Sequence, residues 1–177
     1  PKTPRRQRQM CIRDRVVIAE ELGRACAPVP FSSSVYLAAE AIMALGTEAQ
    51  KQAWLPKLAD GSAIGCFALG EAGGAVTPDQ ISTSIADGVI NGTKVPVADG
   101  GIADVAIVVC KSDGGDGATL ALVDLGQDAV AKDNVQMIDF SRGHSELTFN
   151  GACAEVLGEE GAGLSLIHIS EPTRPQC

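Results

Sequence analysis

The chain has 177 residues, of which 45% are hydrophobic and 20% are charged, and its formal net charge is −8. This acidic balance disfavours contact with a phosphate backbone, so no nucleic-acid partner is expected. No apolar run reaches the ~18 residues that a membrane span needs, so no membrane association is expected either.

Both ends of the chain resemble translated sequencing adapters. Gln9–Arg15 and Leu164–Ile169 can be encoded by DNA stretches that are reverse complements apart from one leading base. These stretches resemble the transposase end sequence used to prepare sequencing libraries, and the segments beyond them resemble the two different adapters. We therefore expect residues 1–15 and 164–177 to be adapter artefacts from a metagenomic library. The natural segment, 16–163, then holds seven basic and twenty acidic residues.

The cysteines of the natural segment are Cys26, Cys66, Cys110 and Cys153. They are widely spaced, without a Cys-x-x-Cys pair or a histidine at ligand spacing, so no metal site is expected. Each cysteine is expected to pack as a small buried hydrophobe. This usage favours a reducing, cytoplasmic location.

Helices are predicted in the first part of the natural segment. Val16–Ala27 alternates apolar with charged residues and ends at two prolines. A run of three serines offers N-caps to Val35–Leu45, which is almost entirely apolar and is expected to be buried on several sides. Thr47 is expected to cap a third helix, Glu48–Ala59, which an Asp-Gly pair closes.

After Gly61 the sequence changes to the alternation typical of strands. The predicted strands are Ile64–Leu69, Gln80–Ala86, Val89–Val97, Asp104–Lys111, Ala118–Leu125, Val135–Phe140 and Ser145–Asn150. Asp87-Gly88 between two alternating runs predicts a hairpin. Because the strands do not alternate with helices, a doubly wound sheet is disfavoured. The predicted fold class is α+β: a short N-terminal helical segment followed by an antiparallel β-barrel-like domain.

The first predicted strand runs directly into a glycine-rich loop, Gly70–Ala75. The end of such a strand can present an apolar wall and a row of backbone N–H groups, and glycines let the backbone approach a ligand closely. This combination suits a large, flat, partly anionic cofactor. An ordinary turn is the alternative.

Four stretches, in order and spacing, resemble the acyl-CoA dehydrogenase family. Gly46–Gly61 resembles the helix before the family's middle domain, and Phe67–Gly73 resembles its Phe-Ala-Leu-Thr-Glu-Pro-Gly loop. Asn91–Lys94 followed by Ala103–Val105 resembles its Asn-Gly-Thr-Lys…Ala-Asp pattern, and Leu157–Gly163 resembles the entry to its last helical domain. The resemblance covers essentially the whole natural segment.

The resemblance implies a domain plan and a reaction. Residues 16–62 would be the end of an N-terminal helical domain and 63–163 a middle β domain for flavin and acyl-CoA, while the C-terminal four-helix bundle is missing. The cofactor would be FAD and the substrate an acyl-CoA thioester, oxidised between its α and β carbons, as in fatty acid or steroid degradation. No catalytic residue is expected within the chain, because the family's carboxylate base would lie beyond Gly163. The parent protein would be a homo- or hetero-oligomer that passes electrons to an unidentified acceptor.

The resemblance also implies site residues. The residues expected to bind the cofactor are Phe67, Leu69, Gly70, Pro96, Val97 and Ala98. Val76 and Arg142 are expected on the substrate side, although a structural ion pair is the alternative for Arg142. Gly70 replaces the family's usual threonine, and Ala98 stands where the family usually has threonine or serine. Two hydroxyl donors to the flavin are therefore absent.

Two other functions remain open. Such a loop also suits a non-catalytic partner subunit of a heteromeric acyl-CoA dehydrogenase, or a related flavin monooxygenase or acyl-CoA oxidase. A carboxylate facing the flavin from the missing bundle would support the dehydrogenase, and its absence would support the partner subunit.

Overall fold

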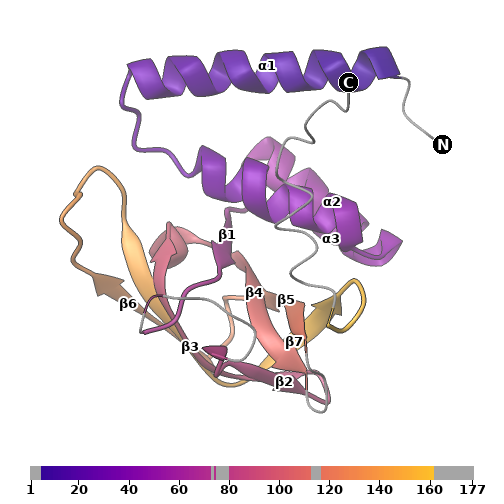
Figure 1. Ribbon diagram of the computed structural model, residues 1–177, viewed down its shortest axis with the longest axis vertical. Coiled ribbons are helices and arrows are strands. Elements are labelled where there is room, and N and C mark those ends of the chain that lie inside the picture. Colours follow the sequence, from indigo (N-terminus) through magenta and orange to yellow (C-terminus); the bar gives the residue numbers. More distant parts are fainter. Residues whose placement is uncertain (1–4, 73, 75–79, 113–116, 162–177) are drawn as a thin grey trace.

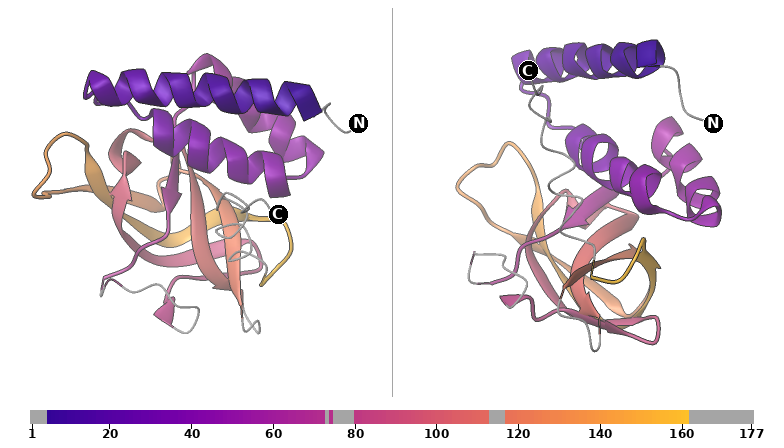
Figure 2. Two further views of the ribbon diagram at one scale, coloured as in Figure 1. Left: turned by 45° about the horizontal axis from the view of Figure 1, so that its top comes forward. Right: turned by 45° about the vertical axis from the view of Figure 1, so that its right-hand side comes forward.

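The computed structural model describes residues 5–72, 74, 80–112 and 117–161 (Figure 1). A curled sheet forms the lower part of Figure 1, and helices lie above it. Figure 2 shows helices covering one side of the sheet, with the first helix of the chain as a further layer outside them. The predicted order, helices followed by a barrel-like sheet, is confirmed.

The helical elements are α1 (Arg5–Arg24), η1 (Ser32–Ala39), α2 (Glu40–Leu45) and α3 (Glu48–Asp60). Helix α3 begins as predicted, because the Thr47 side chain accepts from the Gln50 N–H while the Gln50 side chain accepts from the Thr47 N–H. It ends at Gly61, whose φ of 78° favours glycine. Gln50 also ties α3 to the sheet, since its Nε2 donates to Glu155 at 2.9 Å.

The predicted helix at 35–45 differs from the observed one. It begins earlier, and its first part, η1, is wound as a π-helix that continues into α2. None of the serines caps it, because two of their hydroxyls make tertiary hydrogen bonds instead. The Ser34 Oγ accepts from the Gly65 N–H at 3.2 Å, and the Ser33 Oγ donates to Asp99 at 2.6 Å.

Helix α1 includes the predicted helix at 16–27 except for its last residues, but it starts at Arg5, inside the segment expected to be adapter. The Tyr36 hydroxyl donates to the Arg15 carbonyl at 2.7 Å, and the Arg15 side chain pairs with Glu40. The domain division at residue 15 stays a prediction.

The strands are β1 (Gly65–Ala68), β2 (Ser84–Ala86), β3 (Val89–Ala98), β4 (Val105–Ser112), β5 (Ala118–Asp124), β6 (Val130–Val135) and β7 (His144–Leu157), with a short 3-10 turn, η3 (Gly100–Ile102), before β4. Strands β4, β2, β3, β7 and β5 pair in that order, and β5 pairs back to β4, so they close a ring. Strand β1 pairs with residues 105–108 of β4, on the edge that β2 uses at residues 111–112, and β6 pairs with β7.

The ring is not wholly antiparallel, which corrects part of the prediction. Strands β1 and β2 each pair with β4 in parallel. Neither is joined to β4 by a tight turn, and parallel partners need a longer connection. The predicted hairpin between β2 and β3 is present, with φ of 50° at Asp87 and 75° at Gly88, as a type I′ turn requires.

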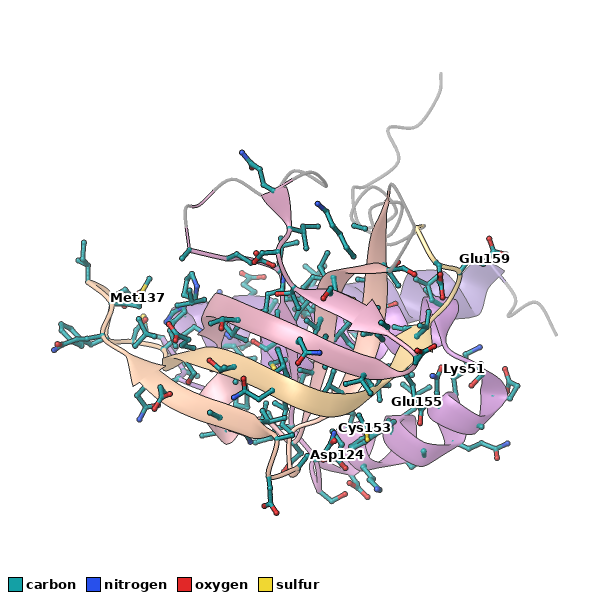
Figure 3. All side chains as sticks on the ribbon, turned by 90° about the horizontal axis from the view of Figure 1, so that it is seen from below. Lys51, Asp124, Met137, Cys153, Glu155 and Glu159 are labelled. Carbon is teal, nitrogen blue, oxygen red and sulfur yellow. The ribbon has the colours of Figure 1, made fainter. Side chains whose placement is uncertain are left out.

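The predicted strand Val135–Phe140 is wrong. The strand in this region is β6, which ends at Val135, and the following segment is irregular, with Ile138 99% exposed. Strand β6 was not predicted because it pairs only with β7 among the described strands and is largely exposed, so it needs no apolar alternation. Figure 3 shows Met137 on the segment that projects beyond this edge.

Two clusters of buried side chains share β4. Val105, Ile107 and Val109 pack with Ile42 and Leu58 of the helical layer. The alternate residues of β4 face the interior of the ring, and their neighbours there include Ile90, Val97, Leu147 and Phe149. Burial on both faces explains why β4 is an unbroken apolar run.

Two of the four cysteines are buried as predicted. Burial raises the pKa of the Cys66 and Cys110 thiols to about 12. Cys26 and Cys153 are exposed, so the prediction of burial is wrong for them.

The approach of β1 to the helical layer gives the first testable prediction. A Cβ added to Gly65 would lie 2.6 Å from the Ala38 Cβ. Gly65→Ala is therefore expected to lower the free energy of unfolding by about 1–3 kcal/mol, measured by chemical denaturation. The matched control is Gly143→Ala, because nothing lies within 4 Å of the Cβ it adds. Equal stabilities of the two variants would contradict this packing.

Candidate functional site

The six residues predicted to bind a cofactor lie at the ends of two strands. Phe67, Leu69 and Gly70 lie in β1 or directly after it, and Pro96–Ala98 end β3. The Val95 N–H donates to the Gly70 carbonyl at 3.0 Å, so the structure brings the two segments together. Gly70 is closely approached, because a Cβ added there would lie 3.2 Å from the Val95 carbonyl oxygen.

The side chains of these segments divide between the inside and the outside of the ring. Phe67 and Leu69 are half-buried and pack with the cluster beneath the helices. Pro96 is exposed and Ala98 half-buried. Val97 is 0% exposed inside the ring, so only its backbone could contact a cofactor. We call the other five residues, Phe67, Leu69, Gly70, Pro96 and Ala98, the apolar wall.

A buried ion pair joins the same two segments. Glu71 follows Gly70, and Lys94 precedes Val95. The Lys94 side chain is 0% exposed, and its Nζ lies 2.7 Å from Glu71 Oε1 and 3.2 Å from the Leu69 carbonyl oxygen. The Glu71 carboxylate also accepts from the Ser82 N–H at 2.8 Å and from the Thr83 N–H at 3.1 Å. The glycine loop is thereby attached to β3 and to the segment that leads into β2.

The hydrogen bonds around Glu71 decide its charge. Burial raises the pKa of Glu71, but hydrogen bonds from Lys94, Ser82 and Thr83 outweigh burial and lower it to about 2. Burial lowers the pKa of Lys94, and the neighbouring Glu71 carboxylate opposes that change. Removal of either partner of such a charge-assisted pair would leave the other charge buried and unpaired, and would destabilise the fold.

Arg142 makes the structural ion pair that was one of its two predicted roles. Its guanidinium pairs with Asp99, and its Nη2 donates to the Ser33 Oγ at 2.8 Å. His144 is the first residue of β7, and its Nδ1 lies 3.2 Å from the Arg142 carbonyl oxygen. Val76 lies outside the described residues, so its predicted substrate contact stays a prediction.

Four residues of this region were not predicted as site residues from the sequence: Lys94, Glu71, Asp99 and Ser33. A signal existed for Lys94. It lies on the same side of β3 as the buried Ile90, and a lysine on an inward-facing side of a strand needs a buried partner. Ser33 and Asp99 carry no such signal, because their hydrogen bond joins residues 66 positions apart.

Within the described ranges, no three His, Cys, Asp or Glu side chains gather as metal ligands. None of the helices in the described part of the chain is long and apolar enough to cross a membrane.

Comparison with known proteins points to one family. The sequence model described as "Acyl-CoA dehydrogenase, N-terminal domain" matches residues 8–62. The short-chain specific acyl-CoA dehydrogenase of Megasphaera elsdenii is 34% identical over 167 residues, which are 85% of this chain and 43% of that protein. The chain therefore spans less than half the length of this relative.

Solved structures agree with the sequence comparison. The butyryl-CoA dehydrogenase structure from Megasphaera elsdenii superposes with a TM-score of 0.68 at 28% identity, covering 78% of this chain and 40% of that one. The glutaryl-CoA dehydrogenase of Mycobacterium smegmatis in complex with FADH2 superposes with a TM-score of 0.61 at 29% identity, covering 73% and 34%.

The Lys94–Glu71 pair gives a second prediction. Lys94→Met leaves the Glu71 carboxylate without its buried cation, so the free energy of unfolding is expected to fall by about 3 kcal/mol. The matched control is Lys51→Met, since Lys51 pairs with Glu48, which is 83% exposed. That change is expected to stay within about 0.5 kcal/mol. Similar losses in both variants, measured by denaturant unfolding, would contradict the assignment.

A third prediction concerns acid. The pKa of Glu71 falls from 4.5 to about 2 on folding, so its stabilising contribution is complete above pH 4.5 and is lost as the pH falls towards 2. The contribution of Glu71 to the free energy of unfolding is up to about 3 kcal/mol. Denaturant unfolding at pH 7 and pH 3 should show a smaller loss in the double variant Glu71→Gln/Lys94→Met than in the unsubstituted chain. Equal losses would show that other carboxylates carry the acid sensitivity.

Proposed function

We propose that this chain, a relative of the acyl-CoA dehydrogenase family, is part of an FAD-dependent enzyme that desaturates an acyl-CoA thioester between its α and β carbons. The observation that carries the proposal is the apolar wall, which the Gly70–Val95 hydrogen bond assembles from two strand ends. A flavin ring needs apolar walls with few polar groups. The solved relative with FADH2 supports this choice of cofactor.

The residues of the chain have separate roles in this proposal. Phe67, Leu69, Pro96 and Ala98 would pack against the ring, and the backbone at Gly70 would approach it closely. When bound, FAD supplies the acceptor for the hydride that leaves the β carbon. Val76 is proposed on the acyl-CoA side, and the whole protein is proposed to act in the cytoplasm as an oligomer of like or related subunits.

The base that removes the α-proton is proposed to come from outside this chain. Glu71 is the carboxylate beside the apolar wall, but its pKa of about 2 makes it a weak proton acceptor at neutral pH. Its oxygens also accept from Lys94, Ser82 and Thr83. The Asp99 carboxylate is likewise engaged, by Ser33 and Arg142.

A second candidate is a non-catalytic partner subunit. It is favoured by one observation: neither Gly70 nor Ala98 offers a side-chain hydroxyl to a flavin. Each missing hydrogen bond would weaken binding by about 0.5–1.5 kcal/mol. The two candidates therefore differ in whether the chain binds FAD.

The testing experiment titrates FAD with the purified chain and follows flavin fluorescence. Saturable binding is expected, and its absence would support the partner subunit instead. With FAD and a panel of acyl-CoAs, no reduction of an artificial electron acceptor is expected, because loss of general base catalysis alone costs about 10²–10⁴-fold in rate. Turnover at ~1–10³ s⁻¹, as in intact enzymes, would place the base within this chain.

A substitution that is expected to strengthen FAD binding tests whether the apolar wall faces the flavin. Ala98→Ser returns a hydroxyl to the half-buried end of β3. It is expected to tighten FAD binding by about 0.5–1.5 kcal/mol, a factor of roughly 2–12. Ala131→Ser, on the exposed face of β6, is the matched control and should leave the dissociation constant unchanged. Equal effects of the two changes would mean that Ala98 does not face the flavin.

A further inference from the structure

Asp99 stands directly after the wall segment and adopts an unusual backbone conformation. Its φ of 59° and ψ of 10° place it in the left-handed region, where aspartate and asparagine are tolerated better than most residues. Its N–H donates to the Gly143 carbonyl at 2.9 Å. A backbone of this kind persists when its surroundings hold it in place.

The side chain of Asp99 is held from two further directions. It is 7% exposed, and its Oδ2 accepts from the Ser33 Oγ at 2.6 Å and from the Arg142 guanidinium. Ser33 is 2% exposed and belongs to η1 of the helical layer. Arg142 precedes β7. We call Ser33, Asp99 and Arg142 the Asp99 clasp, because it joins three segments that are distant in the sequence.

The guanidinium of Arg142 is already committed within the clasp. Its Nη2 donates to both Asp99 and Ser33. Its Nε is buried and has no hydrogen-bond partner among the described residues, so solvent does not reach it. Two cavities, of about 350 and 450 Å³, border Arg142.

We infer that Asp99 is a positioning residue, whose clasp fixes the Pro96–Ala98 end of the apolar wall against η1, and that Arg142 acts through Asp99 rather than by touching acyl-CoA. This inference rests on the proposed function. The wall ends one residue before the clasp, so the clasp decides where Ala98 lies relative to Phe67 and Leu69. A rigid scaffold of this kind is what a binding site requires of its supporting residues.

The test compares Asp99→Asn and Arg142→Gln in the full chain. Asparagine tolerates the left-handed backbone, so Asp99→Asn removes the charge but keeps the local conformation. Asp133→Asn, on the exposed face of β6, is the matched control. Backbone hydrogen exchange is followed in peptides that cover residues 95–100. FAD and coenzyme A are each titrated against every variant at a temperature well below the thermal midpoint of the least stable one.

Asp99→Asn and Arg142→Gln are each expected to speed exchange in 95–100 and to weaken FAD binding by about tenfold. The double variant should be no worse than either single one, because both changes break the same contact. Arg142→Lys, which keeps the charge, should restore part of the affinity, and Asp133→Asn should change nothing.

Three outcomes would overturn the inference. Faster exchange with unchanged FAD affinity would make the clasp purely structural. Weaker coenzyme A binding in Arg142→Gln, with FAD binding unchanged in both variants, would mean that Arg142 touches the substrate. If the unsubstituted chain binds no FAD, the proposed function fails first and the inference falls with it, so the two failures are distinguishable.

Discussion

The arrangement of this molecule depends on one buried charge. Lys94 lies inside the ring of strands with no exposed side-chain surface, and an ammonium group there is tolerated only beside an anion. Glu71 supplies the anion, and it can do so only if the loop after β1 folds back beneath β3. The pair thus requires the two strand ends to meet, and their outer sides become the apolar wall. The electrostatic requirement inside the ring and the shape of the surface outside it have the same cause.

The parts of the fold that were predictable are those set by local chemistry. The capping of α3 by Thr47 and the hairpin at Asp87-Gly88 follow from a few neighbouring residues, and both are present. The errors arise where tertiary contacts outweigh local pattern. Two of the serines before Val35 use their hydroxyls on distant partners, and β6, at the edge, shows no apolar alternation because little of it is buried.

The same distinction applies to the candidate site. The residues of the apolar wall could be chosen because they stand in recognisable stretches, and the hydrogen bond between Gly70 and Val95 shows why two distant stretches belong together. Two of the polar residues that hold the wall could not be chosen in this way. Ser33 and Asp99 are ordinary surface residue types, and only the closed ring and its helical cover bring them within bonding distance of each other and of Arg142.

Strand β4 is the common partition between the two hydrophobic clusters, with Val105, Ile107 and Val109 on one side and Ala106, Val108 and Cys110 on the other. Because β4 contributes side chains to both clusters, loss of the helical layer would expose one face of a strand that the ring also needs. Neither cluster can therefore be disrupted alone. The helical segment and the β domain, separate as units of sequence, are therefore expected to melt as one cooperative unit. The boundary near residue 62 therefore separates two stretches of sequence but not two units that unfold independently.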